Sequence, residues 1–330
     1  RLGLGTRRVG AAEVAEAHHG AARERLLSAR QERRLTIMRH YFDVVLADME
    51  YNRANEHMAI VFVGLDRVRD RYELGQVSDV ELAEREATYQ QALSDRNRAQ
   101  LNRRAARNQL AATLNQPGSP PDRVRPPPLP VLEREPPPLD ELRQAVRDDN
   151  PELLALRREV EARQAAVRAA DRSNSPRLDV ELAGHVWSEN MRSSNDWEAA
   201  LRLEVPFYQG GARSAARDGA RARLREARAR LREMEMALDQ AVLEAWMELD
   251  NLAADRDAAD SRRDYREQYL AYSRSLYQME LAADLGDAMV ELTAAQKRQA
   301  EAAFNIAMTW ARIDALQGLM PGPGREGEKP

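Results

Sequence analysis

The 330-residue chain has no cysteine and only five histidines. Without cysteine, disulfide bonds, thiolate nucleophiles and thiolate metal sites are excluded. The histidines lack metal-ligand spacing beside a carboxylate, and phosphate-binding loops, nucleophile elbows and zinc-protease helices are missing from the sequence. We therefore expect no enzyme: no catalytic residue, no metal and no cofactor. The histidines are His18, His19, His40, His57 and His185.

Long apolar runs and a surplus of positive charge are also missing. The longest apolar run, Met58 to Leu65, is far shorter than the roughly 18 residues of a membrane helix. With 50 Lys+Arg against 54 Asp+Glu, the net charge of −4 gives no basis for binding nucleic acid. Aromatic residues make up 5% of the chain and charged residues 32%, which suits long solvated helices better than one thick core.

Proline is concentrated in one place. Ten prolines lie between Pro117 and Pro138, including two proline triplets, so residues 117–138 are expected to form an extended, semi-rigid connector. By contrast, no proline interrupts Thr6 to Leu74, and none occurs from Ser214 until Pro321. Such long uninterrupted segments are typical of coiled coils or helical repeats.

Apolar spacing supports long helices. Steps of three and four recur in two sets of residues, which favours helices with one apolar face. We expect helices at about 6–73, 79–115, 139–172, 211–283 and 287–316; the first would be roughly 100 Å long. The chain would thus descend in one long helix and return in two shorter helices placed end to end. The two apolar sets are Leu35, Met38, Phe42, Val45 and Met49, and Leu224, Leu231, Met234, Leu238, Val242 and Leu249.

The two halves of the chain repeat each other at a constant offset of 205 residues, which indicates a duplication. Tyr41 corresponds to Trp246, and we interpret both as packing anchors between helices. The expected organisation is a first helical repeat at 1–116, the connector at 117–138, a second repeat at 139–320 containing a β-hairpin at 177–206, and a disordered tail at 321–330. The other matched pairs are Gly5 and Gly210, Arg8 and Arg213, Ala11 and Ala216, and Tyr72 and Tyr277.

That hairpin has two alternating segments, Arg177–Val186 and Trp197–Val205. Each has about the length that crosses a bilayer as a tilted strand. A hairpin half-buried on a soluble core has the same alternation, although a lone two-stranded hairpin is barely stable in water. If the apolar face meets lipid, its lipid-facing residues are Leu178, Val180, Leu182, Leu201, Leu203 and Val205.

Four motifs follow one another along the chain. A helical tip carries Tyr72-x-x-Gly75-x-x-Ser78-Asp79, and Asn150-Pro151-Glu152-Leu153 opens a helix. Ser175-Pro176-x-Leu178 leads into one strand, and Val205-Pro206-Phe207-Tyr208-x-Gly210-Gly211-x-Arg213 leads out of the other. In this order and together with the duplication, the chain resembles the TolC-type outer membrane efflux proteins over nearly its whole length.

The resemblance implies a mainly α fold. Its long antiparallel coiled-coil helices form a periplasmic α-barrel, and a transmembrane β-hairpin contributes to a trimeric β-barrel. The implied function is the exit duct of a tripartite efflux or type I secretion system, which passes substrates passively from the periplasm to the exterior. The implied partners are two further copies of the chain, a periplasmic adaptor (membrane fusion) protein, an inner-membrane pump and outer membrane lipid, with no nucleic acid. The implied location is the outer membrane of a Gram-negative bacterium, extending into the periplasm.

Two departures from the family pattern stand out. Shifting the hairpin back by 205 positions puts its counterpart before Arg1, so the first repeat's strands are expected upstream and the chain is expected to be N-terminally truncated. At the second tip, Glu280 stands where the first tip has Gly75, so we expect a different turn there.

Two groups of residues are candidates for function. Three acidic residues, Asp284, Asp287 and Glu291, share a helix face; repeated three-fold they would form an acidic ring that favours cations near a gate. The alternative is an ordinary solvated helix face. The candidate adaptor-binding tip, whose plainer interpretation is a capped turn, comprises Leu74, Gly75, Gln76, Val77, Ser78, Asp79, Leu281, Ala282 and Ala283.

Two other function classes stay open. A soluble coiled-coil scaffold would explain the helices but neither the alternating strands nor the proline connector. A periplasmic adaptor would carry one helical hairpin beside a lipoyl-like β-domain, which this sequence lacks. The exported substrate is not encoded in any recognisable motif.

Overall fold

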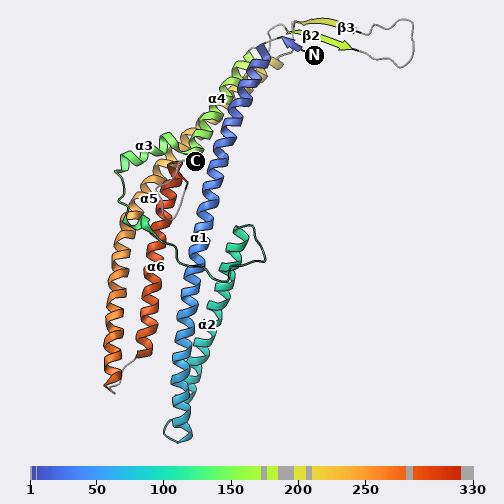
Figure 1. Ribbon diagram of the computed structural model, residues 1–330. Coiled ribbons are helices and arrows are strands. Elements are labelled where there is room, and N and C mark those ends of the chain that lie inside the picture. Colours follow the sequence, from blue (N-terminus) through green and yellow to red (C-terminus); the bar gives the residue numbers. More distant parts are fainter. Residues whose placement is uncertain are drawn as a thin grey trace, which may run out of the picture. The chain divides into compact units, whose positions relative to one another are not determined.

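The computed structural model describes residues 2–4, 6–171, 177–184, 197–205, 210–279 and 285–320. Long helices dominate it (Figure 1), which confirms the predicted mainly α fold. The expected tail at 321–330 lies outside the described residues. In chain order the elements are β1 (Leu2–Leu4), α1 (Thr6–Glu73), α2 (Asp79–Thr113), the short 3₁₀ helix η1 (Pro130–Glu133), α3 (Leu139–Asp149), α4 (Pro151–Asp171), β2 (Arg177–Gly184), β3 (Trp197–Glu204), α5 (Ala212–Gln278) and α6 (Leu285–Leu316).

Two compact units share these elements. The first unit comprises residues 1–29 and 143–241, and the second comprises residues 30–142 and 242–330. Each unit therefore takes one segment from each sequence repeat. The sheet and α4 lie in the first unit, whereas α2, the connector and α6 lie in the second.

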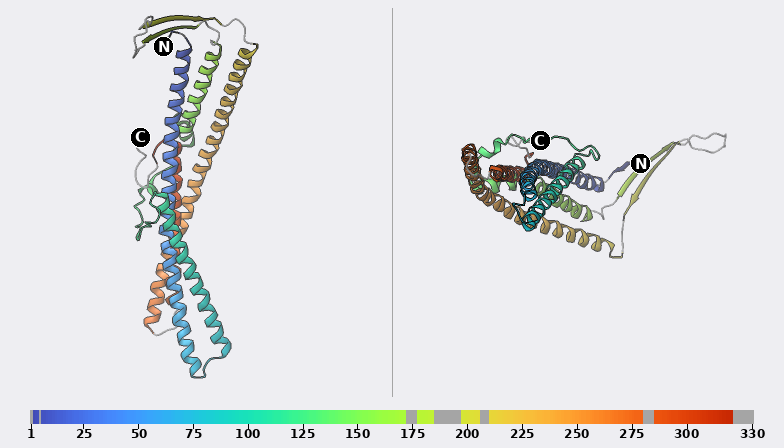
Figure 2. Two further views of the ribbon diagram at one scale, coloured as in Figure 1. Left: turned by 90° about the vertical axis from the view of Figure 1, so that its right-hand side faces the viewer. Right: turned by 90° about the horizontal axis from the view of Figure 1, so that it is seen from below.

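In the second unit, α2 runs antiparallel beside the C-terminal part of α1 (Figures 1 and 2). Arg107 pairs with Asp48 at 2.8 Å and Arg69 pairs with Glu86 at 3.0 Å, so ion pairs join the two helices at two places along their contact. Between them, the guanidinium of Arg103 stacks over the ring of Tyr51, 3.8 Å from its centroid.

The core of the second unit lies between α1 and α6. The rings of Phe42 and Phe304 are stacked with centroids 4.3 Å apart, and Met38, Val45 and Ala307 pack around them. These α1 residues belong to the predicted apolar face, which is confirmed as core. Since each large side chain here is almost fully buried, the packing is expected to contribute about 2–5 kcal/mol per residue lost to alanine.

The proline-rich connector covers this core. Val124, Leu129 and Val131 pack against the cluster. Arg256 of α5 donates a hydrogen bond to the carbonyl of Leu132 at 3.0 Å. Because proline cannot donate a main-chain hydrogen bond, the connector depends on side chains of the helices to hold it in place.

The predicted helix at 139–172 is interrupted. It is divided into α3 and α4 at Asn150, which is buried. Pro151 has no N–H and disfavours helical geometry at the residue before it. The Asn150 side chain accepts a hydrogen bond from the Leu153 N–H at 3.0 Å and so caps the new helix.

The sheet has the strand order β1-β2-β3, with both pairings antiparallel. Leu178 lies opposite Leu203 and Val180 opposite Leu201, so the apolar positions share one face as predicted. The sequence analysis placed the strands of the first repeat upstream of Arg1. The structure adds a short strand that it did not name: β1 pairs with β2, and Leu4 lies opposite Leu178.

Among the described residues, none of the helices has a stretch apolar and long enough to cross a membrane.

Candidate functional site

The turn between α1 and α2 is an exposed helical tip. Gly75 has a left-handed φ of +68°. Its N–H bonds to the Tyr72 carbonyl at 2.8 Å, and the Gln76 N–H bonds to the Arg71 carbonyl at 2.9 Å. This is a Schellman ending, for which glycine is preferred because a Cβ disfavours that φ. The sequence signal of a glycine-terminated helix is therefore confirmed in detail.

The second helix of the tip is capped from the same turn. The hydroxyl of Ser78 accepts a hydrogen bond from the Glu81 N–H at 3.2 Å, which satisfies one of the free donors at a helix start. Two apolar side chains remain in solvent here, since Leu74 is 70% exposed and Val80 is 77% exposed. Val77 is half-buried. The tip thus presents apolar groups on a rigid, capped turn.

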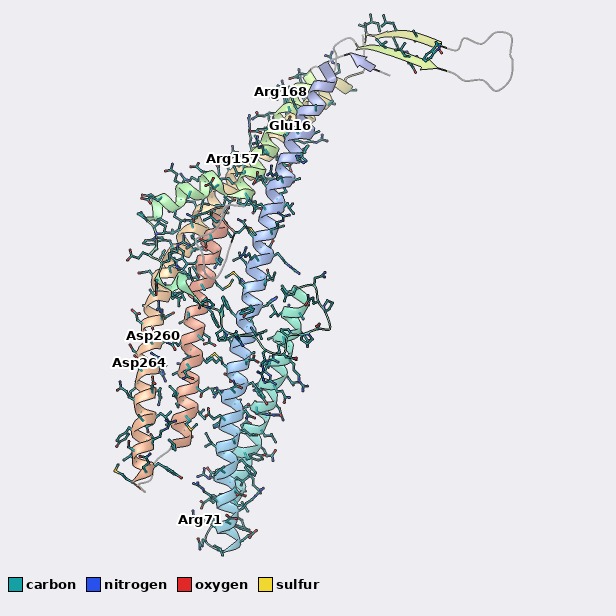
Figure 3. The ribbon with its side chains drawn as sticks, in the orientation of Figure 1. Glu16, Arg71, Arg157, Arg168, Asp260 and Asp264 are labelled. Atoms are coloured by element: carbon teal, nitrogen blue, oxygen red, sulfur yellow. The ribbon has the colours of Figure 1, made fainter. Side chains whose placement is uncertain are left out.

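Charged groups surround these apolar side chains. Asp79 accepts a hydrogen bond from the Tyr72 hydroxyl, which raises the pKa of Tyr72. Arg71, labelled in Figure 3, lies at the C-terminal end of α1, where a cation interacts favourably with the helix dipole. The tip can therefore make both apolar and polar contacts with a binding partner.

The second tip is described only in part. Leu281, Ala282, Ala283 and Asp284 lie outside the described residues. Of the acidic candidates, Asp287 is exposed near the start of α6. Glu291 is ion-paired with Arg266 of α5 at 3.1 Å, so its charge is partly compensated. The structure therefore pairs Glu291 with a cation, and Asp287 lies one turn earlier on the same helix.

The N-terminal turns of α6 lie close to α1. A Cβ built on Gly286 would stand 2.6 Å from Cγ2 of Ile60, closer than real side-chain contacts, so only glycine fits there without a shift. About two and three turns further on, the Thr293 hydroxyl donates a hydrogen bond to Glu56 at 2.9 Å and Lys297 pairs with Glu50 at 3.2 Å.

Glu50 is the centre of an ion-pair network that the sequence analysis did not anticipate. It accepts hydrogen bonds from Arg53 at 2.6 Å and pairs with Lys297, which also pairs with Glu301. Burial alone would raise the pKa of Glu50, but the hydrogen bonds from Arg53 and Lys297 outweigh it and the pKa is lowered. The network joins α1 to α6 through groups that are about one-third exposed.

On the hairpin, the apolar face is in solvent. Leu182 is 67% exposed, Trp197 80%, Leu201 71% and Leu203 63%. Val205 is also exposed and Val180 is half-buried. The side chain of Leu178 lies outside the described part of the chain, although its strand position shares the same face. A contiguous exposed apolar patch of this kind marks a surface that meets lipid or protein.

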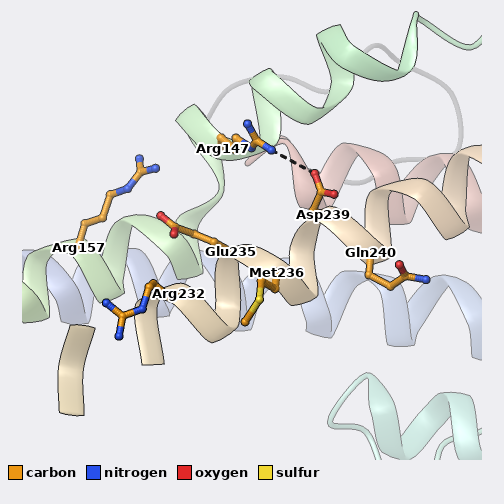
Figure 4. Close-up of a pocket in the computed structure, with 7 residues that line it drawn as sticks. All are labelled: Arg147, Arg157, Arg232, Glu235, Met236, Asp239 and Gln240. Carbon is orange, nitrogen blue, oxygen red and sulfur yellow. Dashed lines mark hydrogen bonds and ion pairs between the residues drawn. The ribbon is translucent and has the colours of Figure 1, made fainter. Parts of the chain in front are cut away.

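The first unit also contains an open cleft of about 780 Å³ between α3, α4 and α5 (Figure 4). Its lining is mixed in charge, and an ion pair between Arg147 of α3 and Asp239 of α5 at 3.3 Å crosses it. Arg143 pairs with the same carboxylate at 3.2 Å. We interpret the pairs as links between helices. The lining residues are Arg147, Arg157, Arg232, Glu235, Met236, Asp239 and Gln240.

The exposed tip and the exposed hairpin face are suited to contact with a partner or with lipid. In the part of the chain that the structure describes, no group of three or more His, Cys, Asp or Glu side chains could hold a metal ion. The two features best exposed for contact are the apolar hairpin face and the α1–α2 tip.

Comparisons with known proteins agree with this arrangement. The outer membrane efflux protein family model matches residues 142–319. The chain is similar in structure to the CmeC outer membrane channel of Campylobacter jejuni, with a TM-score of 0.73 and 14% identity over 96% of this chain and 68% of that one. It is also similar to the open state of the MtrE outer membrane channel of Neisseria gonorrhoeae, with a TM-score of 0.71 and 20% identity over 96% and 72%.

A third solved structure, the outer membrane protein VceC of Vibrio cholerae, gives a TM-score of 0.68 at 16% identity over 96% of this chain and 77% of that one. No curated protein matches the chain. At these identities the solved structures show the fold, and the family model, which covers more than half of the chain, shows the family. The chain therefore belongs to the outer membrane efflux protein family.

Proposed function

We propose that the chain is the protomer of an outer membrane exit duct, which passes substrates passively from the periplasm to the exterior as part of a tripartite efflux or type I secretion system. The observation that carries this proposal is the exposed apolar face of the β2–β3 hairpin, on a chain that is otherwise rich in charged helices. The side chains of Leu201 and Leu203 are mostly exposed to solvent. Burying this face in lipid is favourable because it removes apolar surface from water. Membership of the efflux protein family supports the same role.

The proposed assembly is a homotrimer. The three-stranded sheet ends in two edge strands, β1 and β3. Unpaired strand edges cannot be exposed to hydrocarbon, so strands from several copies must close into a barrel. The helices would then extend into the periplasm of a Gram-negative bacterium. A soluble coiled-coil scaffold would leave the apolar strand face uncovered, and a periplasmic adaptor is disfavoured by the family to which the chain belongs.

We further propose that the α1–α2 tip binds the periplasmic adaptor, which in turn links the duct to an inner-membrane pump. Leu74 and Val80 are exposed on a turn held by two main-chain hydrogen bonds. Rigid presentation limits the conformational entropy lost on binding. The remaining tip candidates Gln76, Val77, Ser78 and Asp79, and Leu281, Ala282 and Ala283 of the second tip, are proposed as part of the same surface.

At the gate, Asp287 is the strongest candidate for an acidic ring, since it is exposed and near the start of α6. Glu291 would contribute less charge because Arg266 pairs with it. Asp284 stays a proposal from the sequence.

Single-channel recording in planar bilayers tests the duct. We expect wild-type channels to prefer cations and to be blocked by divalent ions, and Asp287→Asn to weaken both effects. Asp239→Asn, which neutralises a carboxylate already paired with two arginines, serves as the charge-matched control. No conductance from a correctly inserted trimer would contradict the proposed function.

Crosslinking to the adaptor tests the tip. Leu74→Asp should abolish crosslinking without changing trimer stability, because the side chain is in solvent. Leu101→Asp is the matched control, since Leu101 is 64% exposed on the same helical hairpin but away from the turn. Equal loss in both variants would show that the tip is not the docking surface.

A further inference from the structure

The first turns of α5 carry an unusual density of arginine. Residues 212–232 contain eight arginines and only two acidic residues, Asp218 and Glu226. All eight arginines are exposed. Such a density on one helix gives a strongly positive local field. The arginines are Arg213, Arg217, Arg221, Arg223, Arg225, Arg228, Arg230 and Arg232.

Neighbouring acidic groups compensate little of this charge. Within the described part of the chain, Arg230 pairs with Glu226 at 2.6 Å and Arg217 approaches Asp218 at 3.8 Å. The other helices of the first unit behave differently. Arg168 of α4, labelled in Figure 3, pairs with Glu13 of α1 at 3.2 Å, and Arg25 pairs with Glu159 at 2.6 Å. Among the residues that the structure describes, the arginines of this segment thus outnumber its acidic side chains by eight to two, which leaves a net positive charge for an external anion.

This basic segment lies directly after the hairpin in the chain. The helix begins at Ala212, eight residues beyond Glu204, the last residue of β3. Arg213, Arg217 and Arg221 follow at steps of four, so they share one face of the helix over about 12 Å. Gly210 and Gly211 have left-handed φ angles of +57° and +82°, and they turn the chain just before this face.

We propose that Arg213, Arg217 and Arg221 bind the anionic headgroups of phospholipids in the leaflet next to the helices. This inference rests on the proposed function, because it requires the apolar hairpin to be inserted in the bilayer. Guanidinium groups bind phosphate through paired hydrogen bonds. The attraction of a basic group to an anionic surface fades within a Debye length of about 8 Å at physiological salt, so only the first turns of α5 take part.

The size of the effect can be stated. A basic residue near an anionic membrane surface raises membrane partitioning by about fivefold. Three of them therefore give at most roughly 100-fold, and the arginine furthest from the surface contributes least. The arginines therefore set the depth and the lipid preference of the duct, whereas the apolar hairpin drives insertion itself. A neighbouring copy of the chain is the competing occupant of this face.

Vesicle flotation of the full chain tests the inference, with phosphatidylcholine alone or mixed equally with phosphatidylglycerol. The triple variant Arg213→Gln, Arg217→Gln, Arg221→Gln should lose most of the gain in binding caused by phosphatidylglycerol. The triple Lys variant at the same positions should keep it, since charge is retained. The control removes three exposed arginines of α1 and α2 in the second unit, with Arg67, Arg85 and Arg104 changed to Gln, and should keep the gain.

Each outcome decides something. Loss of the gain in the Gln triple alone, together with suppression of the wild-type gain by high salt, supports the proposal. If the Gln triple variant still binds better to vesicles with phosphatidylglycerol, the proposal is overturned. If that variant also fails to trimerise, the arginine face is a contact between protomers. Protease protection of the hairpin in phosphatidylcholine vesicles reports insertion separately. Its absence in the wild type would contradict the proposed function, whatever the headgroup dependence.

Discussion

Tyr41 and Trp246, which lie 205 positions apart, each donate a side-chain hydrogen bond to a main-chain carbonyl of the proline-rich connector. The Tyr41 hydroxyl bonds to the carbonyl of Arg125 at 2.6 Å, and Nε1 of Trp246 bonds to the carbonyl of Pro137 at 3.1 Å. The two repeats thus use the same aromatic position to bind the connector that joins them, each at a different place. The duplicated aromatic position gained a shared role as an anchor for the connector.

Removing these donors should loosen the connector. We expect Tyr41→Phe to lower the free energy of unfolding by about 1 kcal/mol, because a carbonyl loses its hydrogen bond while the ring is kept. Trp246→Phe should cost more, since it also removes ring volume. Limited proteolysis within 117–138 measures the loosening directly. Tyr277→Phe, which removes a hydroxyl from a 59% exposed side chain, should leave the cleavage rate unchanged.

A second link to the connector should depend on pH. Asp314 of α6 is 2% exposed, and Arg134 pairs with it at 2.8 Å while stacking over Trp310. Burial raises the pKa of Asp314, and the hydrogen bond from Arg134 partly offsets this. Because the folded pKa is raised, the contribution of Asp314 to stability is complete below its unfolded pKa and is lost as pH rises through the folded pKa.

Arg134→Gln should therefore destabilise the protein in a pH-dependent way. At about pH 7 we expect a loss of about 2 kcal/mol, since a buried carboxylate loses its charge-assisted hydrogen bond. At about pH 4 the loss should be smaller, because the protonated carboxyl tolerates burial. Urea midpoints at both pH values measure the difference. A loss that is equal at the two pH values would show that Asp314 is not the group responsible.

Gly286 should tolerate no larger residue while Ile60 is present. Gly286→Ala places a Cβ where Cγ2 of Ile60 stands, and overpacking of this kind costs about 1–3 kcal/mol. The better helix propensity of alanine returns at most about 1 kcal/mol. In a double-mutant cycle, adding Ile60→Ala should relieve the clash and give a coupling energy of about 1 kcal/mol or more. Additive effects would mean that the two helices separate freely at this point.

Substitutions on the two faces of the hairpin should differ in their cost to folding. In the inserted protein, Leu201→Arg or Leu203→Arg should each cost roughly 2–4 kcal/mol near the bilayer midplane, because a charge is placed in lipid. Arg202→Leu should be milder, since Arg202 lies opposite Asp179 on the other face. Folding yield in vesicles measures each effect. Equal costs on both faces would show that the register or the insertion is wrong.

Much of the fold followed from pattern alone. The absence of proline over Thr6–Glu73 and the apolar steps through Met38, Phe42 and Val45 were enough for α1 and its core face, because helix period and proline are strong local signals. The alternation at Leu201 and Leu203 likewise predicted which strand positions share the apolar face of the hairpin, since side chains alternate strictly along a strand.

Interactions between distant segments could not be predicted in this way. Two ion pairs, Asp314 with Arg134 and Glu50 with Lys297, join residues 180 or more positions apart. A single sequence does not show which of many opposite charges a given charged residue will contact. The β1 strand was missed because three residues are too few for an alternation to be seen. Asp284 and the residues 281–283 lie outside the described residues.

The division of each compact unit between two remote stretches of chain has a consequence for biogenesis. The second unit needs residues 30–142 and 242–320 together, and Phe42 finds its stacking partner only at Phe304. As synthesis proceeds from the N-terminus, the core face of α1 around Phe42 has only the connector to cover it until the α6 residues near Phe304 arrive. Contacts of such long sequence separation slow folding and leave apolar surface open to aggregation meanwhile. On the proposed route through the periplasm, the nascent protein should therefore depend on a holding chaperone for longer than a protein of equal length built from consecutive hairpins.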